Sequence, residues 1–362
     1  MPAIDVFFKT MVDFGASDLH MVAESPPLLR MSGEIRPLKY RPIPDAELRS
    51  MLFEMLSERD RKRFTESGDL DCAYELAGVA RFRVNVFEQQ RGVGAVFRQI
   101  PTKILSMQDL NLPPAVGRFV TMDRGLVVVT GPTGSGKSTT LAAIVNEINS
   151  TRRCHIITIE DPIEFVHEPR ECLITQREVG GDTKGFSKAL RAAIREDPDV
   201  ILVGEMRDPE TIGLAITAAE MGVLVFGTLH TNSAPKTVDR VIDAFPASQQ
   251  DQIRTQLAES LQGVVAQQLL KRASGKGRVA AIELLFGSSA LANIIREGKT
   301  HQIAAIMQTG KGEGMQTMDQ VLLDLVMTKV ITVEDAYAKA HDKKLFDKSQ
   351  GGAKAVENAA NA

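Results

Sequence analysis

The sequence has no tryptophan and only three cysteines, Cys72, Cys154 and Cys172, and it contains no C-x-x-C pair. Scattered cysteines exclude a zinc site built on cysteine pairs and a disulfide framework, and they favour a reducing, cytoplasmic environment. Aromatic residues make up 5% of the chain, and the net charge is −3. Because nucleic acids bind to basic surfaces and aromatic stacking platforms, no nucleic-acid partner is expected.

Long hydrophobic runs are also missing. No apolar stretch approaches the ~18 residues of a membrane-spanning helix, and residues 1–5 lack the basic and apolar regions of a signal peptide. Any membrane association is therefore expected to be peripheral, through a partner. With 43% hydrophobic and 25% charged residues over 362 positions, the composition predicts a soluble globular chain of about two domains.

The most informative stretch is residues 125–140. An uncharged apolar run at 126–129, typical of a buried strand, leads into Gly131-x-x-x-x-Gly136-Lys137-Ser138 and then into an apolar helical pattern. Glycines let successive backbone N–H groups point into one concavity, and the helix N-terminus behind them adds partial positive charge. This strand–loop–helix context predicts a phosphate-binding loop that binds a nucleoside triphosphate.

Two side chains of this loop have distinct expected roles. Lys137 is expected to reach the outer phosphates, and the Ser138 hydroxyl is expected to ligate Mg²⁺. The residues predicted to contact the nucleotide in this stretch are Gly131, Thr133, Gly134, Ser135, Gly136, Lys137, Ser138 and Thr139.

Residues 1–100 predict a small α+β domain with an antiparallel sheet. Helical spacing occurs at 6–14 and, as one continuous helix, at about 44–65, and the remaining pattern alternates as in strands. A strand at 81–87 places Arg81 and Arg83 on the same face. Two neighbouring guanidinium groups suit phosphate oxygens across a domain cleft, and an ordinary solvated face is the alternative.

Residues 100–119 contain three prolines and no clear period until 116, which predicts a linker. From residue 125 strands alternate with helices, as in a doubly wound α/β sheet. The predicted strands are 125–130, 155–159, 200–203, 223–228 and 279–285. The predicted helices are 137–149, 186–196, 209–221 and 249–270. The chain from about 288 is expected to be helical, and 347–362 to be a disordered tail.

Polar residues follow four of these strands. The phosphate loop follows the first, acids at 160–164 follow the second, Gly204 and Glu205 follow the third, and His230 follows the fourth. Because ligands of such sheets bind at the carboxyl ends of the strands, these residues are expected to meet at one edge.

The acids and the histidine have separate expected roles. Glu205 follows an apolar strand in the manner of a Walker B acid and is expected to serve the Mg²⁺ shell, through water, since the preceding residue is Gly204 rather than Asp. Glu164 is the candidate base that orients the attacking water, unless the acids only cap the next segment. His230 is the candidate sensor of the γ-phosphate, and a structural histidine is the alternative.

Four motifs occur in a fixed order: the phosphate loop at 131–139, an acidic box at 158–164, a glycine-variant Walker B at 201–208 and a His box at 228–234. Together they resemble the secretion ATPase superfamily of type II secretion and type IV pili, over about residues 1–345. Within it, the chain is similar to pilus retraction ATPases. It begins directly with the small domain, lacks the tetracysteine metal insertion of assembly ATPases, and at 291–303 resembles the C-terminal retraction motif, although 292–297 lacks one arginine.

The resemblance implies a PAS-like α+β domain, a linker, a RecA-like doubly wound ATPase core, a C-terminal helical subdomain and a tail, expected at 1–100, 101–119, 120–287, 288–346 and 347–362. It implies a homohexameric ring that binds ATP and Mg²⁺ between the small and large domains. Glu164 would be the catalytic base, Glu205 the Walker B acid and His230 the His-box histidine, while Arg81 and Arg83 would contact nucleotide.

The same resemblance implies a biological role. Hydrolysis would open and close the cleft between domains, turn an inner-membrane platform protein and draw pilin subunits back into the membrane. A paralogous retraction ATPase is a further expected partner. Two alternatives remain: an ATPase for pilus assembly or type II secretion, and an accessory retraction subunit with little turnover of its own.

Overall fold

The computed structural model describes residues 2–31, 33–100 and 103–346, which fall into two compact units. The first unit comprises Met1–Lys103 and Pro162–Val166, and the second comprises Ile104–Asp161 and His167–Ala362. The short segment Pro162–Val166 therefore groups with the N-terminal unit, although its neighbours in sequence belong to the second.

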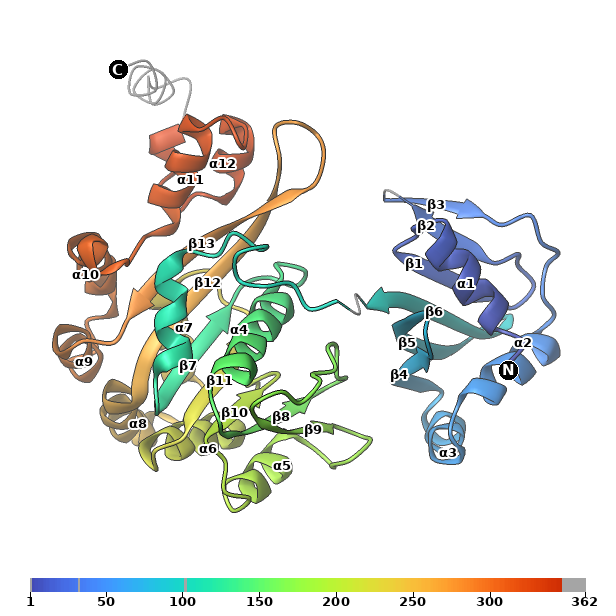
Figure 1. Ribbon diagram of the computed structural model, residues 1–362, viewed down its shortest axis with the longest axis horizontal. Helices are drawn as coiled ribbons and strands as arrows, with labels where there is room; N and C mark the ends of the chain where they lie inside the picture. Colours follow the sequence, from blue (N-terminus) through green and yellow to red (C-terminus); the bar gives the residue numbers. More distant parts are fainter. Residues whose placement is uncertain (1, 32, 101–102, 347–362) are drawn as a thin grey trace. The chain divides into compact units, whose positions relative to one another are not determined.

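The first unit is built on a six-stranded sheet in the order β3-β2-β1-β6-β5-β4, with antiparallel neighbours (Figure 1). Its strands are β1 (Asp18–Val22), β2 (Leu28–Met31), β3 (Glu34–Pro37), β4 (Asp69–Leu76), β5 (Ala80–Gln89) and β6 (Gly92–Ile100). Its helices are α1 (Asp5–Asp13), α2 (Asp45–Met55) and α3 (Glu58–Ser67). A buried aromatic group of Phe8, Phe82 and Phe97 joins α1 to the sheet, with ring centroids 4.4 Å and 4.9 Å from that of Phe8. The predicted α+β unit is confirmed.

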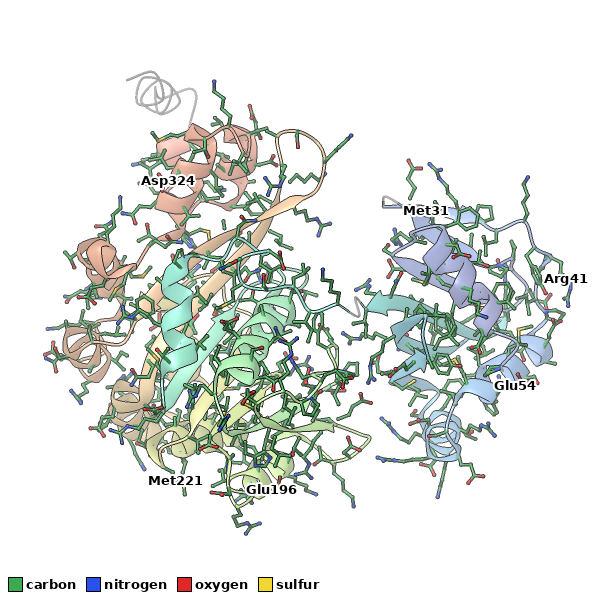
Figure 2. All side chains as sticks on the ribbon, in the orientation of Figure 1. Met31, Arg41, Glu54, Glu196, Met221 and Asp324 are labelled. Carbon is green, nitrogen blue, oxygen red and sulfur yellow. The ribbon has the colours of Figure 1, made fainter. Side chains whose placement is uncertain are left out.

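Side-chain alternation along β5 is also as predicted, because Phe82, Val84 and Val86 are buried while Arg83 is exposed. The single helix predicted at 44–65 is wrong. Leu56 has an extended backbone with ψ 139°, and the Ser57 side chain accepts a hydrogen bond from the Asp60 N–H at 3.1 Å. The extended Leu56 therefore ends α2, and the Ser57 N-cap starts α3. Charged side chains such as Arg41 and Glu54 are exposed on this unit (Figure 2).

The second unit contains a seven-stranded sheet in the order β13-β12-β7-β11-β10-β8-β9, parallel except for β13. Its strands are β7 (Gly125–Thr130), β8 (His155–Glu160), β9 (Leu173–Glu178), β10 (Val200–Val203), β11 (Leu224–Leu229), β12 (Leu261–Lys271) and β13 (Arg278–Phe286). The helices that follow or join them are α4 (Lys137–Thr151), α5 (Phe186–Ala193), α6 (Pro209–Glu220), α7 (Ala234–Asp243) and α8 (Ala247–Ser260). This is the predicted doubly wound α/β architecture.

Every residue of β7, β10 and β11 is buried, which explains why these strands read as continuous apolar runs. The helix α6 ends at Glu220, and the next residue, Met221, is 65% exposed (Figure 2).

The chain crosses from one side of β7 to the other when it reaches β12, so β7 lies at the point where the strand order reverses. Ligands of open α/β sheets bind at the carboxyl ends of strands near this point.

The helix predicted at 249–270 is wrong in its second half. Its first part is α8, but the chain then becomes β12, which pairs with β7 and β13. Eight of the eleven residues of β12 are buried on both faces of the sheet, so the run has no alternation that would distinguish a strand from a buried helix. The strand β9 and the helix α7 were not predicted.

The predicted linker is partly structured, because Pro114–Thr121 forms a 3₁₀ helix whose Val116, Phe119 and Val120 belong to the second unit's core. The C-terminal helices are α9 (Ser289–Arg296), α10 (Ile303–Thr309), α11 (Met318–Met327) and α12 (Val333–Lys339). Thr332 caps α12, since its hydroxyl accepts the Asp335 N–H at 3.1 Å. The predicted tail at 347–362 lies outside the described residues.

Candidate functional site

The phosphate loop connects β7 to α4 through three glycines with positive φ: Gly131 (148°), Gly134 (75°) and Gly136 (90°). Side chains rarely adopt these conformations, and a Cβ on Gly131 would also overlap the Gln267 carbonyl oxygen. Lys137 folds back over the loop and donates to the carbonyl oxygens of Gly131 (2.8 Å) and Pro132 (3.3 Å). The loop thus has the curled backbone that the sequence pattern predicts.

The other loop residues divide into an exposed and a buried group. Thr133, Gly134 and Ser138 are exposed, so they are accessible to a ligand. Ser135 is only 2% exposed, and its hydroxyl has no hydrogen-bond partner within the described part of the chain. The Ser135 backbone N–H donates to the Pro132 carbonyl oxygen at 3.1 Å, so this residue is enclosed within the loop.

Gln267 on β12 supports the loop from beneath. Its amide nitrogen donates to the Ser135 carbonyl oxygen at 2.8 Å, and its amide oxygen accepts the Thr140 hydroxyl at 2.7 Å. One buried side chain thereby ties the loop to the first turn of α4. The sequence reading missed Gln267 because it placed this residue in a helix; a buried strand beside β7 would have pointed to it.

Glu205 and His230 meet at the carboxyl ends of β10 and β11. His230 Nε2 lies 2.8 Å from Glu205 Oε1, and Arg207 Nε lies 2.5 Å from the same oxygen. Burial alone would raise the pKa of Glu205, but the hydrogen bond and charge of Arg207, together with His230, outweigh it and hold the pKa below its usual value. Glu205 is therefore a carboxylate at neutral pH. Arg207 was missed from the sequence, although it stands two residues after the acid.

Gly204 occupies the position before Glu205 for a packing reason. A Cβ there would lie 3.0 Å from the Ile159 carbonyl oxygen and 3.2 Å from the Glu160 Cα of the neighbouring strand β8. The Gly204 N–H donates to that same Ile159 oxygen at 2.8 Å. An aspartate at this position would push β8 and β10 apart, which accounts for the glycine.

Threonines connect the strand ends behind these groups. The Thr130 hydroxyl, at the end of β7, donates to the Thr231 carbonyl oxygen at 2.7 Å, and the hydroxyls of Thr231 and Thr237 are also 2.7 Å apart. The Thr228 hydroxyl donates to the Gly204 carbonyl oxygen. The His box is therefore fastened to both β7 and β10, while the His230 side chain itself is 47% exposed.

The remaining candidates belong to the first unit. Glu164 belongs to Pro162–Val166, and Arg81 and Arg83 belong to β5, so all three are part of the first unit. Arg81 Nη1 lies 3.4 Å from Glu75 Oε2. In the second unit, Glu160 accepts the Thr158 hydroxyl at 2.7 Å and so is held at the end of β8.

Two kinds of feature are absent from the described residues. No group of three or more His, Cys, Asp or Glu side chains there is arranged to hold a metal ion. None of the described helices is both long and apolar enough to cross a membrane.

A parallel RecA-like sheet with a phosphate loop after β7, and with an acid and a histidine at neighbouring strand ends, defines a P-loop ATPase. The chain belongs to the family of type II/IV secretion system proteins, whose family model matches residues 3–360. Its fold class, a small α+β domain followed by a RecA-like ATPase domain, is the one predicted from sequence.

Individual relatives cover nearly the whole chain. It is 54% identical over 326 residues to the type IV pilus retraction ATPase PilT of Pseudomonas aeruginosa, covering 90% of this chain and 94% of that one. It is 40% identical over 332 residues to the type IV pilus ATPase PilU of the same organism, covering 92% and 87%. A crystal structure titled as the pilus retraction motor PilT with bound ADP matches with a TM-score of 0.88 at 46% identity, covering 95% and 98%.

Proposed function

We propose that this chain hydrolyses ATP to ADP and phosphate and that the energy powers retraction of type IV pili. The observation that carries the proposal is the meeting of the phosphate loop, Glu205 and His230 at neighbouring strand ends, in a chain similar over its length to PilT. The chain has greater sequence identity to PilT than to PilU, which favours the role in the PilT name, pilus retraction.

The phosphate loop, residues 131–139, is proposed to bind the triphosphate through backbone N–H groups, with Lys137 on the outer phosphates. A cavity of about 230 Å³ beside Gly136 and Thr139, bordered by Asn111 and Arg278, offers room for the nucleoside. Because the loop already has its curled backbone, little reorganisation is needed when phosphate binds.

Mg²⁺ fits the donors that the chain provides. Ser138 presents an exposed hydroxyl at the first turn of α4, and Glu205 is ionised. A hydroxyl and one carboxylate suit an ion that keeps several waters and otherwise binds phosphate oxygens. When bound, Mg²⁺ would supply charge neutralisation at the phosphates, and Ser138 would hold it directly while Glu205 acts through water.

Chemistry by the remaining residues is part of the same proposal. Glu164 orients the attacking water as general base, and His230 responds to the γ-phosphate. Arg81 and Arg83 bind phosphate oxygens with their guanidinium groups. The depressed pKa of Glu205 keeps a negative charge beside His230 throughout the neutral range.

The higher organisation is proposed as well. The working protein is a homohexamer in the cytoplasm, attached peripherally to the inner membrane through a pilus platform protein and assisted by a paralogous retraction ATPase. The functional parts are a small domain, a linker, an ATPase core, a helical subdomain and a tail, at 1–100, 101–119, 120–287, 288–346 and 347–362.

A deletion strain tests this proposal. Cells without the gene should be hyperpiliated and unable to twitch, and the wild-type gene, but not one encoding Lys137→Ala, should restore twitching. Bald cells would indicate an assembly or secretion ATPase. Full rescue by Lys137→Ala would indicate an accessory subunit that does not need its own turnover.

A further inference from the structure

A buried acid outside the nucleotide site links two parts of the second unit. Glu283 lies on β13 and is only 3% exposed. No lysine, arginine or histidine among the described residues forms an ion pair with it within 4.0 Å. A buried carboxylate is costly unless hydrogen bonds compensate it, so its partners reveal why it is there.

The partners of Glu283 are the first residues of two helices. Oε1 accepts the Ala234 N–H at 2.6 Å, and Oε2 accepts the Met318 N–H at 3.0 Å. Ala234 begins α7 and Met318 begins α11. Helix N-termini carry unsatisfied N–H groups and partial positive charge, so a single carboxylate satisfies both. Burial raises the pKa of Glu283, although these two hydrogen bonds act in the opposite direction.

The first of these helices continues directly from the His box. His230 lies four residues before Ala234, and Ser233 caps α7 by accepting the Lys236 N–H at 3.5 Å. Thr231 is held to Thr130 at the end of β7. His230 is therefore connected to the start of α7 by a short segment of chain that is itself hydrogen-bonded to β7.

The second helix belongs to a separate C-terminal core. Met318 and Leu322 of α11 pack with Ile331, Ala336 and Phe346 in a hydrophobic cluster distinct from the main core of the unit. Next to Glu283, Leu284 exchanges two backbone hydrogen bonds with Gln316, at 2.9 Å and 3.0 Å. The start of α11 is therefore anchored to β13 at Glu283.

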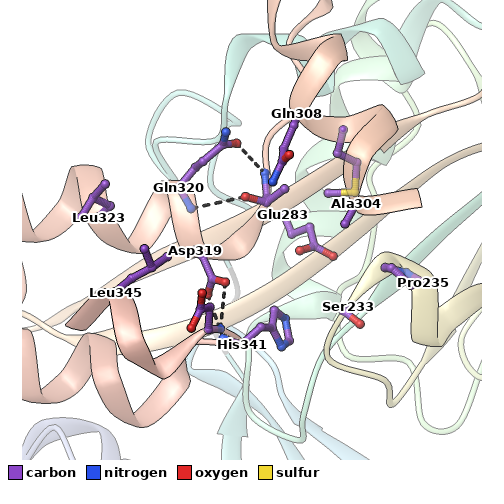
Figure 3. A pocket seen from close by; sticks show the side chains of 13 residues that line it. Ser233, Pro235, Glu283, Ala304, Gln308, Asp319, Gln320, Leu323, His341 and Leu345 are labelled. Carbon is purple, nitrogen blue, oxygen red and sulfur yellow. Dashed lines mark hydrogen bonds between the residues drawn. The ribbon is translucent and has the colours of Figure 1, made fainter. Parts of the chain in front are cut away.

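Space is available around this anchor. A cavity of about 380 Å³ is lined by Glu283 with Ser233, Asp319 and His341, so α7 and α11 are not packed tightly against each other at their N-termini (Figure 3). The Glu283 carboxylate is thus a polar link between the starts of two helices that are separated there by a cavity.

We propose that Glu283 is a positioning residue of the ATPase site, which fastens the His box, through the start of α7, to α11 and the C-terminal helices. Movements of the His box that follow nucleotide binding then reach the C-terminal core through this carboxylate. The inference rests on the proposed function, in which His230 responds to the γ-phosphate.

Hydrogen exchange on the full chain, with and without MgATP, tests it together with steady-state kinetics. In the wild type, nucleotide should slow exchange at 131–139, at 228–236 and at 317–327. Glu283→Gln keeps one acceptor but points an amide N–H₂ at the other donor. It should leave the KM for ATP within about threefold, lower kcat roughly tenfold and abolish the response at 317–327.

Asp319→Asn is the matched control. Asp319 lines the same cavity and accepts two backbone N–H groups, from His341 (2.8 Å) and Asp342 (3.0 Å), neither of which belongs to α7. This variant should keep the wild-type kcat and the response at 317–327. If Glu283→Gln does not fold, Glu283→Asp, which is one methylene shorter and keeps the charge, should show the same kinetic defect in a folded chain.

The outcomes separate the two proposals. If the wild type shows no protection at 131–139, the proposed function fails. If 131–139 and 228–236 respond but 317–327 does not, or if folded Glu283 variants retain wild-type kcat and response, only the role of Glu283 is overturned.

Discussion

At the scale of single residues, the candidate site depends on how neighbours set the charge of one acid. Glu205 would have a raised pKa from burial alone, yet the net shift is downward because Arg207 and His230 both contact Oε1. Arg207 is itself 77% exposed, so its effect operates through a short hydrogen bond rather than through burial.

Arg207→Met should raise the pKa of Glu205, because it removes the strongest group that lowers it. In the wild type the Glu205 carboxylate stays ionised when the pH falls below the usual pKa of a glutamate. In the variant the carboxylate takes up a proton at a higher pH, so the acid limb of the plot of kcat/KM for ATP against pH should shift to higher pH. The measurement is ATPase activity from about pH 4 to pH 8. A superimposable acid limb in both proteins would show that Glu205 does not govern it.

His167 gives a second pH prediction, for stability rather than activity. It is 6% exposed, its Nδ1 has no partner within the described part of the chain, and burial lowers its pKa from 6.5 to about 4. The folded state thus binds the proton less readily than the unfolded state. His167 therefore leaves the free energy of unfolding unchanged above pH 6.5 and lowers it by about 3 kcal/mol as the pH falls to 4.

His167→Leu should remove that part of the pH dependence, as measured by urea unfolding at several pH values. His301→Gln, at an exposed histidine, should behave as the wild type. An unchanged slope for His167→Leu between pH 4 and 6.5 would contradict the assignment.

At the scale of elements, the sequence predicted best what depends on local pattern. The strands β7, β10 and β11 follow from short apolar runs, and the loop after β7 follows from its glycines. The strand β12 was mistaken for helix because both of its faces are buried, and with it Gln267 was lost. The contact between Glu205 and Arg207 could not be read from sequence, since it depends on side-chain directions after Gly204.

The helix α9 illustrates the same limit. The adjacent apolar residues Ile294 and Ile295 do not by themselves show which side of α9 faces the protein. Ile295 is 1% exposed and belongs to the main core, whereas Asn293 and Arg296 are exposed. Which side of a short helix faces the protein was decided by its neighbours, not by its own pattern.

The Gln267 side chain, which joins β12 to the phosphate loop, should determine the affinity for nucleotide. Gln267→Leu removes both hydrogen bonds and leaves the Thr140 hydroxyl and the Ser135 carbonyl oxygen without that partner. The Kd for MgATP should rise roughly tenfold, while kcat at saturation stays within about threefold. Isothermal titration gives the Kd, and Gln268→Leu, at the adjacent buried glutamine, is the control with little expected effect. Equal Kd values for wild type and Gln267→Leu would contradict this role of Gln267.

At the scale of the whole molecule, sequence order and structural grouping differ at one segment, Pro162–Val166, which carries the candidate base. Glu164 follows β8 in the chain, but Pro162–Val166 groups with the N-terminal unit. The motif order indicated a base at Glu164, yet a sequence pattern carries no information on which compact unit a short loop joins.

Glu164→Ala should retain ATP binding and lose roughly 10²–10⁴-fold in kcat, the usual effect of removing a positioned base. Glu168→Ala, at an exposed acid further along the chain, is the control and should keep wild-type turnover. Normal turnover by Glu164→Ala would assign the base elsewhere.

The most direct test of the account measures ATP binding and Mg²⁺-dependent phosphate release in the same preparations of wild-type protein and Lys137→Ala. The wild type should bind ATP and release phosphate only with Mg²⁺, and the variant should lose tight binding and release none. Phosphate release by Lys137→Ala at the wild-type rate would show that the loop between β7 and α4 is not where ATP is hydrolysed.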